Sequence, residues 1–311
     1  MGKFAASGVY AALITPRRTN STEADGSALL DYLDFVGRSG VQGFVLFGST
    51  GEFVHYDLQE RIRVVTLAVR RSRVPVLVNV SHSCLSGACD LAQNAIASGA
   101  EGVLLMPPFF YKYSDDQIFA FYAEFHRIVG HTMPVYLYNL PFFTNPISPA
   151  LMIRLLETGH FAGVKDSSGD WNLFEVLQQL KKSVQFQLLV GNESIYLRAR
   201  QSGADGIVSG VAGALPELII ALDECVSTAK FELASQLNTK LVEMLGWLNR
   251  FPATVAIKQT ALTRVWLKSG FALPLDEATT SALCEYRRWI QDNLPGLLAQ
   301  CRQACAVSSF P

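Results

Sequence analysis

The sequence predicts an α/β protein, a (β/α)8 TIM barrel with a helical appendix at its C-terminal end. Eight short apolar runs alternate with helical patterns up to about Cys225, and this alternation is typical of parallel strands covered by helices. A second observation is a glycine-marked junction that recurs before several of the runs. More residues follow Cys225 than one closing helix needs, which indicates the appendix.

The eight predicted strands are short and apolar, as strands buried on both faces of a parallel sheet should be. Helical patterns separate them, such as the spacing of Leu58, Ile62 and Val65. An open, doubly wound sheet is the alternative, but no G-x-G-x-x-G follows the first run, which favours the closed barrel. The predicted strands are Val9–Ile14, Gly43–Phe47, Pro75–Val80, Gly102–Met106, Pro134–Tyr138, Phe161–Val164, Phe186–Val190 and Gly206–Ser209.

The junctions share a small residue and a glycine, followed three or four residues later by a glycine at the start of a strand. Because glycine ends helices in the left-handed conformation, each junction is interpreted as a helix end, a tight turn and a buried strand. The clearest examples are Ser39–Gly43, Ser98–Gly102 and Ser202–Gly206, and Thr158–Gly163 is a looser version.

We divide the chain into a barrel domain at residues 1–227 and a C-terminal helical domain at residues 228–311. Amphipathic patterns predict helices at Lys230–Arg250 and Ala253–Lys268. A third helix is expected from about Glu277, with a break at Pro295 and a resumption to Cys305. The break is expected because proline removes a backbone donor and disrupts a helix interior.

Composition narrows the classes of function. Half of the 311 residues are hydrophobic, 17% are charged and the net charge is −1, so the chain is globular, and no clustered basic face predicts nucleic-acid binding. No apolar run approaches the roughly 18 residues of a membrane span. The start at Met1–Phe4 lacks a long apolar region and a processing site, so we expect no secretion signal. None of the six cysteines forms a C-x-x-C pair or a zinc-like spacing. Reduced thiols, a cytoplasmic location and no bound metal are therefore expected.

The most informative residue for function is Lys165, which follows the apolar run Phe161–Val164. Burial disfavours the charged form of an amine, and a neutral amine can attack a ketone to form a Schiff base. The ordinary alternative is a lysine that reaches the rim or pairs with Asp166. The predicted barrel favours the first interpretation, because active sites in such barrels lie at the C-terminal ends of the strands.

Other polar residues follow neighbouring strands and would converge on Lys165. Gly48-Ser49-Thr50-Gly51 offers two hydroxyls and backbone amides that can bind a carboxylate, and Tyr138 offers a phenol for proton transfer. An ordinary polar turn and a core tyrosine are the alternatives for these two. Further candidates at the strand ends are Tyr111, Gly191 and Ser209.

Three segments together resemble one family. Gly48-Ser49-Thr50-Gly51-Glu52, Tyr138-Asn139-Leu140-Pro141 and Gly163-Val164-Lys165-Asp166 are similar, in this order, to segments of the dihydrodipicolinate synthase / N-acetylneuraminate lyase superfamily. These are class I, pyruvate-handling aldolases and dehydratases, and the resemblance covers essentially the whole chain.

The resemblance implies a role for each matched residue. Lys165 would form the Schiff base, Tyr138 would shuttle protons, and Ser49 and Thr50 would bind the carboxylate and relay protons. A second tyrosine, often from a neighbouring subunit in this family, would match Tyr111, or Phe110 would take its place. The resemblance also implies a homo-oligomer, either a dimer or a tetramer, and no cofactor.

Two departures separate the chain from the best-known members. The synthases carry an arginine after the Tyr-Asn motif to grip a carboxylate of the second substrate, whereas this chain has Pro141–Thr144 with Phe143 near that position. Sialic-acid lyases carry Asp-Glu after the glycine of the seventh strand, whereas this chain has Gly191-Asn192-Glu193. Gly48–Phe53 and Lys165–Asp170 are more similar to 4-hydroxy-2-oxoglutarate and 2-keto-3-deoxy-sugar-acid aldolases. Phe142 and Phe143 favour a compact or partly aromatic second substrate.

The sequence therefore predicts a cofactor-free lyase that forms a Schiff base with pyruvate or another 2-oxo acid, for aldol cleavage, condensation or dehydration. The predicted catalytic residues are Lys165, Tyr138 and Thr50. The predicted substrate-binding residues are Ser49, Thr50, Gly48, Tyr111, Phe143, Gly191 and Ser209.

Three alternatives stay open at this point. One is a true dihydrodipicolinate synthase, and another is a barrel that binds a 2-oxo acid as a sensor without turnover. The third is a metal-dependent aldolase, which would need clustered histidine and carboxylate ligands. Of the five histidines, His55 follows Glu52 closely enough to line the pocket, or it is a loop histidine.

Overall fold

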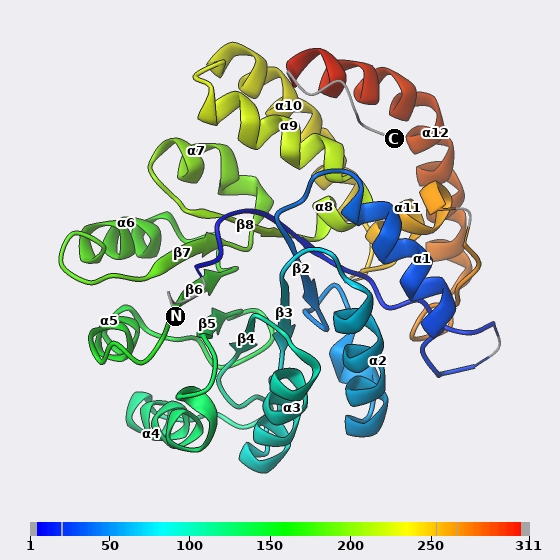
Figure 1. Cartoon of the computed structure of the whole chain (residues 1–311). Helices are drawn as coiled ribbons and strands as arrows, with labels where there is room; N and C mark the ends of the chain where they lie inside the picture. Colours follow the sequence, from blue (N-terminus) through cyan, green and yellow to red (C-terminus); the bar gives the residue numbers. More distant parts are fainter. Residues whose placement is uncertain (1–4, 20, 253, 266, 306–311) are drawn as a thin grey trace.

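Parallel strands close into a barrel in the computed structural model, which describes residues 5–19, 21–252, 254–265 and 267–305 (Figure 1). Neighbours in the sequence pair with each other, and β1 also pairs with β8, so the sheet has no free edge. The predicted (β/α)8 barrel is confirmed. The strands are β1 (Gly8–Ala12), β2 (Gly43–Leu46), β3 (Val76–Asn79), β4 (Gly102–Leu105), β5 (Val135–Asn139), β6 (Gly163–Asp166), β7 (Gln187–Val190) and β8 (Gly206–Ser209).

The sixth strand differs most from its prediction. The apolar run stops at Val164, but β6 continues through Lys165 and Asp166. Lys165 is paired with Tyr138 of β5 on one side and with Leu189 of β7 on the other. The prediction ended the strand too early because hydrogen bonds to both neighbours hold polar residues in the sheet.

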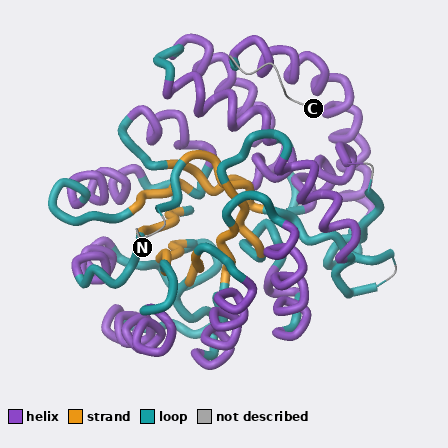
Figure 2. Tube along the Cα trace, viewed as in Figure 1, coloured by secondary structure: helices purple, strands orange, loops and turns teal. Residues whose placement is uncertain are grey.

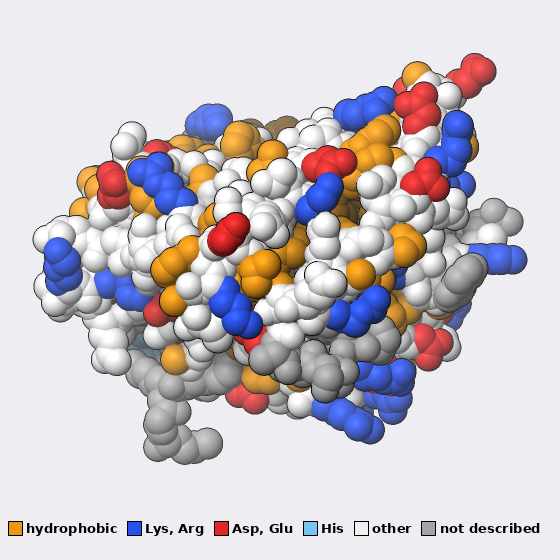
Figure 3. Space-filling view, turned by 90° about the horizontal axis from the view of Figure 1, so that it is seen from above, with side chains coloured by type: hydrophobic (Ala, Val, Ile, Leu, Met, Phe, Trp, Pro, Cys, Tyr) orange, Lys and Arg blue, Asp and Glu red, His pale blue; other side chains and the backbone are white. Residues whose placement is uncertain are grey.

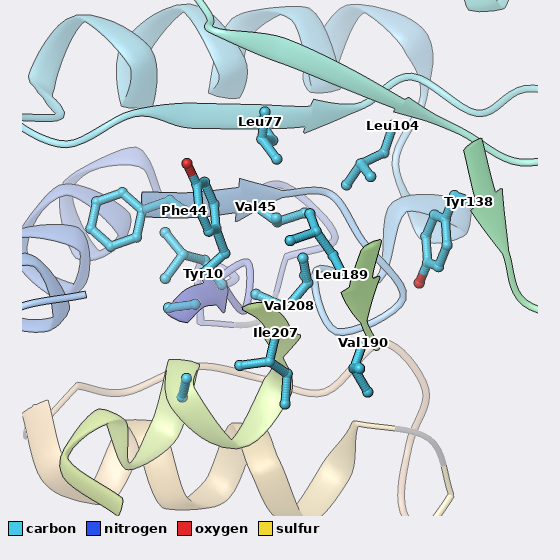
Figure 4. Packing of buried hydrophobic residues seen from close by; sticks show 14 of the residues in the cluster. Tyr10, Phe44, Val45, Leu77, Leu104, Tyr138, Leu189, Val190, Ile207 and Val208 are labelled. Atoms are coloured by element: carbon cyan, nitrogen blue, oxygen red, sulfur yellow. The ribbon is translucent and has the colours of Figure 1, made fainter. Parts of the chain in front are cut away.

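Apolar side chains fill the inside of the barrel. In Figure 4, the side chains of Val45, Leu77 and Leu104 point toward one another between the strands, and Tyr138 lies beside this group. All four residues are at most 1% exposed. Barrel interiors are packed cores and not pores, so Tyr138 stands next to a dry core.

Helices surround the barrel, as the purple ring around the orange strands in Figure 2 shows. Their starts are set by side chains that accept backbone N–H groups, for example Asp25, Asp57 and Asp170. These helices are α1 (Gly26–Gly37), α2 (Leu58–Arg71), α3 (Leu85–Ser98), α4 (Asp115–Phe125), α5 (Pro149–Glu157), α6 (Trp171–Leu180), α7 (Tyr196–Gln201), α8 (Gly210–Ala214) and α9 (Pro216–Ser227). Short helical turns are η1 (Phe53–His55), η2 (His126–Gly130) and η3 (Glu193–Ile195).

The glycine junctions have the conformation that the sequence predicts. Gly40, Gly99, Gly159 and Gly203 have φ angles of 93°, 91°, 67° and 94°, in the left-handed region that favours glycine. Each follows a helix and precedes the next strand. The recurring sequence pattern is therefore a recurring helix-to-strand turn.

The C-terminal helices α10 (Phe231–Leu248), α11 (Val255–Val265) and α12 (Glu277–Ala304) follow the barrel, and α10 and α12 lie beside α9 outside the ring (Figure 1). The predicted break at Pro295 is wrong, because α12 continues through it. Ile290 and Leu297 are both buried on either side of Pro295, so packing offsets the missing backbone hydrogen bond. Ala253, where the second predicted helix begins, lies outside the described residues. The division of the chain at residue 227 stays a prediction.

The surface carries both signs of charge. On the face shown in Figure 3, acidic and basic side chains are interspersed among neutral and hydrophobic ones. All six cysteines are unpaired thiols. Within the described ranges, no helix has the length and apolar character needed to cross a bilayer. Met1–Phe4, where we expect no export signal, lies outside these ranges.

Candidate active site

Lys165 lies inside β6 and is only 3% exposed. Its Nζ stands 3.9 Å from the centroid of the Tyr138 ring, on the strand with which β6 pairs. The alternative in which Lys165 pairs with Asp166 is not what the structure shows. The Asp166 carboxylate instead accepts hydrogen bonds from Asn139 Nδ2 at 2.7 Å and from Ser168 Oγ at 2.7 Å.

Tyr138 is completely buried, and its hydroxyl oxygen lies 3.4 Å from Ser49 Oγ, across the barrel on the loop after β2. Burial by itself would raise the pKa of Tyr138. The positive charge of Lys165, together with hydrogen bonds from Lys165, Ser49 and Ser167, outweighs burial and lowers the pKa of Tyr138 below its ordinary value. An amine, a phenol and a hydroxyl thus form a contiguous polar group.

The turn that carries Ser49 and Thr50 is closed by backbone hydrogen bonds, from Gly51 N–H to the Gly48 carbonyl and from Glu52 N–H to the Ser49 carbonyl, each 3.0 Å. Phe47, which precedes it, has a φ of 54°, an uncommon conformation for a residue other than glycine. The Phe47 carbonyl accepts a hydrogen bond from Asn79 Nδ2 at 2.7 Å. A β-carbon at Gly51 would lie 2.9 Å from the Phe47 backbone, so this turn requires glycine there. Strained backbone that the surroundings fix in this way is often found at functional sites.

Thr50 and Gly191 contact different parts of the site. Thr50 is 8% exposed, and its Oγ1 lies 3.0 Å from where a β-carbon on Gly210 would stand, so it faces the start of α8. A β-carbon on Gly191 would lie 2.9 Å from Lys165 Cε and 2.1 Å from Ser167 Oγ. Gly191 therefore leaves the space that the Lys165 side chain needs.

Ser209 has its hydroxyl engaged within the protein. It donates to Glu193 Oε1 at 2.7 Å and accepts from the Ala212 backbone N–H at 3.0 Å, at the N-terminus of α8. Both interactions fix the end of β8 relative to the loop after β7. Its role in substrate binding stays a prediction.

Sequence reasoning missed a buried ion pair below the turn. Glu52, at the end of the turn, has a φ of 56°. Its carboxylate accepts hydrogen bonds from Lys258 Nζ at 2.8 Å and from Thr254 Oγ1 at 3.1 Å. Arg17 Nε lies 3.8 Å from Glu52 Oε2. Burial lowers the pKa of Lys258, although Glu52 opposes that shift. No pattern near residue 52 could have indicated partners in α11.

A cavity of about 210 Å³ opens next to Ser49. Its apolar lining is formed by Phe53, Val54, Met106, Phe109, Leu140 and Phe143. Its polar lining consists of Ser49, Glu52, His55, Thr144 and Thr254. His55 thus lines the pocket, which was one of the two positions expected for it. It is an exposed residue, at the rim of the cavity. Leu140 belongs to the Tyr138–Pro141 segment that the sequence indicated, but the sequence did not predict that Phe53 and Met106 line a cavity.

The residues after Phe109 lie on the surface. Phe110 is 87% exposed and Tyr111 is 67% exposed, with their ring centroids 5.0 Å apart. Phe109, and neither of these two, is among the residues that line the cavity. Which of the two occupies the second-tyrosine position stays a prediction.

Histidine, cysteine and carboxylate side chains are the usual protein ligands of metal ions. Among the described residues, no group of three or more of them could hold a metal ion.

Comparison with known proteins gives one consistent family. A family model described as the dihydrodipicolinate synthetase family matches residues 5–293. A 4-hydroxy-tetrahydrodipicolinate synthase of Kosmotoga olearia is 26% identical over 291 residues, which cover 92% of this chain and 97% of that protein. A protein of Escherichia coli K12 named as a probable 2-dehydro-3-deoxy-D-pentonate aldolase is 30% identical over 226 residues, covering 71% of this chain and 74% of that protein.

The fold is shared with solved structures. The crystal structure of dihydrodipicolinate synthase from Aquifex aeolicus matches with a TM-score of 0.84 at 23% identity, covering 93% of this chain and 98% of that chain. At this identity the likeness shows the fold alone.

Proposed function

The chain belongs to the dihydrodipicolinate synthetase family, whose members are lyases of the class I aldolase type, and from this premise we propose that it cleaves and forms the C3–C4 bond of a 4-hydroxy-2-oxo acid. One product of cleavage is pyruvate and the other is an aldehyde. The observation that carries the proposal is the buried Lys165 amine, 3.9 Å from the Tyr138 ring centroid, with the Tyr138 hydroxyl 3.4 Å from Ser49.

The carboxylate and the C2 carbonyl of the 2-oxo acid are the groups that the site binds first. The hydroxyls of Ser49 and Thr50 and the amides of their turn hold the carboxylate, because several donors together can replace its hydration. Lys165 Nζ then attacks the C2 carbonyl carbon. Loss of water leaves an iminium ion that joins C2 to Lys165.

Cleavage moves one proton and one electron pair. Tyr138, acting through or beside Ser49, removes the proton of the C4 hydroxyl. The C3–C4 bond breaks, its electrons pass to the iminium nitrogen, and the aldehyde leaves. The enamine that remains regains a proton at C3, and water hydrolyses the iminium to release pyruvate and free Lys165. A lowered pKa suits Tyr138 to this exchange, because a proton shuttle works best when its pKa is near the operating pH.

Lys258 is the competing amine, since it is also completely buried. Its Nζ donates a hydrogen bond to the Glu52 carboxylate at 2.8 Å, so attack on a carbonyl would break this buried ion pair. Lys165 has the Tyr138 hydroxyl group beside it and no carboxylate partner among the described ion pairs. We therefore assign the Schiff base to Lys165.

The same features argue against the two remaining alternatives. A dihydrodipicolinate synthase must bind a second carboxylate, but neither lysine nor arginine lines the cavity. A sensor needs only the carboxylate-binding turn, whereas here a phenol and an amine stand beside it. The family relationship and the exposed Phe110 and Tyr111 support a homo-oligomer, a dimer or a tetramer, which light scattering of the purified protein can test. The cytoplasmic location stays a prediction.

The test is reductive trapping. Incubation with pyruvate and borohydride should add one reduced pyruvate per chain, and peptide mass mapping should place it on Lys165. Lys165→Ala should abolish both the adduct and the release of pyruvate from 4-hydroxy-2-oxoglutarate or 2-keto-3-deoxy sugar acids. A label on Lys258 would contradict the assignment, and an adduct without turnover of any 4-hydroxy-2-oxo acid would favour the sensor.

A further inference from the structure

The cavity beside Ser49 is where the aldehyde half of the substrate must lie. Ser49 lines it, and the Ser49 hydroxyl is 3.4 Å from the Tyr138 hydroxyl, so the cavity begins where the C4 oxygen exchanges its proton. The group attached to C4 therefore extends away from Lys165 into this space. The character of the cavity wall then decides which aldehydes fit.

Most of the polar groups in the wall are already satisfied by the protein. Glu52 is bound by Lys258 and Thr254. The Thr144 hydroxyl donates to backbone carbonyls, with the Leu140 oxygen 3.1 Å away. The groups that remain for a ligand are Ser49 and the exposed His55 at the rim.

An anionic or polyhydroxylated group would be poorly accommodated here. A carboxylate that leaves water without a cation or several donors is costly, and Lys258, the cation bound to the wall residue Glu52, is already engaged in that ion pair. Several sugar hydroxyls would lose water and would find only Ser49 and His55 as side-chain partners in the wall. The aromatic and aliphatic lining, from Phe53, Phe109 and Phe143 among others, instead favours an apolar group.

The size of the cavity sets an upper limit. An apolar cavity of about 150 Å³ accepts a benzene ring, and this one has about 210 Å³. One six-membered ring or a short branched chain fits together with the aldehyde carbon.

We propose, on the basis of the function proposed above, that the aldehyde partner is uncharged and apolar, with a single aromatic ring or a branched alkyl group seated in this cavity. In the forward condensation, C3 of the enamine forms a bond to the aldehyde carbon. The aldehyde oxygen receives the proton from Tyr138, and hydrolysis at Lys165 releases a 4-hydroxy-2-oxo acid with an apolar group on C4. Cleavage is the same sequence in reverse.

The kinetic experiment compares acceptors with pyruvate as the common donor. The efficiency, kcat/KM, is measured for benzaldehyde, 3-methylbutanal, glyoxylate and D-glyceraldehyde, with products quantified by mass spectrometry. We expect the two apolar aldehydes to exceed the other two by at least tenfold. Phe143→Ala should lower kcat/KM for benzaldehyde about tenfold or more. Even one methylene group in an apolar pocket changes the discrimination between substrates by roughly 10- to 200-fold. Phe231→Ala is the control, because Phe231 is a similarly exposed ring on α10.

The proposal is overturned if glyoxylate or glyceraldehyde is preferred while pyruvate still forms its adduct on Lys165. It is also overturned if Phe143→Ala and Phe231→Ala change the benzaldehyde value equally. A missing pyruvate adduct would instead contradict the proposed function, so the two failures can be told apart.

A binding experiment tests the cavity without any chemistry at Lys165. Benzyl alcohol, which cannot react, should bind the wild-type protein in a saturation-transfer NMR titration, and glycerol should not. Val54→Asp places a carboxylate in the wall and should weaken benzyl alcohol binding at least tenfold. Val242→Asp, at a similarly exposed valine on α10, should leave binding unchanged. Equal binding of benzyl alcohol by the two variants would refute the proposal.

Discussion

Removal of the Tyr138 hydroxyl is the sharpest test of the assigned chemistry. Tyr138→Phe keeps the buried ring, and with it the 3.9 Å contact between Lys165 Nζ and the ring centroid. What is lost is the phenolic proton and the 3.4 Å interaction with Ser49. The Schiff base should therefore still form, while proton transfer to and from the C4 oxygen should fail.

The expected size of the effect separates catalysis from structure. A general acid–base group contributes about 10²–10⁴-fold, which is about 2.7–5.4 kcal/mol at 1.36 kcal/mol per tenfold. A lost neutral hydrogen bond costs only about 0.5–1.5 kcal/mol, or roughly tenfold at most. A fall in kcat of a hundredfold or more is therefore too large to come from the contact with Ser49 alone.

Two measurements distinguish the steps. Borohydride trapping with pyruvate reports Schiff-base formation, and pyruvate release from a 4-hydroxy-2-oxo acid reports kcat and KM. We expect trapping and KM to change little while kcat falls. If kcat falls by less than tenfold while the variant stays folded, as judged by circular dichroism, another group carries the proton and our reasoning about Tyr138 is wrong.

Three further predictions follow from the same contacts. Lys165→Met removes the charge that lowers the pKa of Tyr138, so burial should raise that pKa. The tyrosinate absorbance that Tyr138→Phe abolishes should then appear at a higher pH than in the wild-type protein. An unchanged transition would contradict the role of the Lys165 charge. Glu52→Gln leaves Lys258 buried without its counter-charge and should lower the free energy of unfolding, measured with urea, by about 3–5 kcal/mol. The double variant with Lys258→Met should recover most of that loss. If the losses of the two substitutions add instead, the two residues are not coupled. Phe143→Arg should raise the rate at which pyruvate condenses with aspartate semialdehyde, relative to wild type. If the wild-type protein already prefers the semialdehyde over 4-hydroxy-2-oxoglutarate and 2-keto-3-deoxy acids by tenfold or more in kcat/KM, about 1.4 kcal/mol, the inference from Phe143 is wrong.

The fold could be predicted because its signals are local. Each strand is a short apolar run, and glycines such as Gly99 and Gly203 adopt left-handed φ angles of 91° and 94° after their helices. Consecutive strands of a barrel are neighbours, so the pairing of Lys165 with Tyr138 follows from the order β5, β6. The break expected at Pro295 failed because packing on both sides of α12 depends on distant residues that the local sequence does not reveal.

The sequence indicated the residues of the site whose side chains carry reactive or polar groups. It did not indicate the apolar residues that form the wall of the cavity through tertiary packing. Lys165, Tyr138 and Ser49 carry reactive or polar groups that the sequence displays directly. Phe53 and Met106 line the cavity only because the turn after β2 and the end of β4 approach each other. Apolar residues at such places look like ordinary core residues in a sequence.

The C-terminal helices are part of this site, although their sequence carries no catalytic pattern. The turn with Ser49 and Thr50 ends at Glu52, whose left-handed φ of 56° is costly for a residue with a side chain. Lys258 and Thr254, more than 200 residues away in the sequence, bind that carboxylate from α11 and its preceding turn. Because a buried carboxylate without partners is unstable, these contacts hold the end of the turn and, through it, the Ser49 hydroxyl that lies 3.4 Å from the Tyr138 hydroxyl. The division at residue 227 therefore separates sequence patterns, whereas the geometry of the site depends on both parts of the chain.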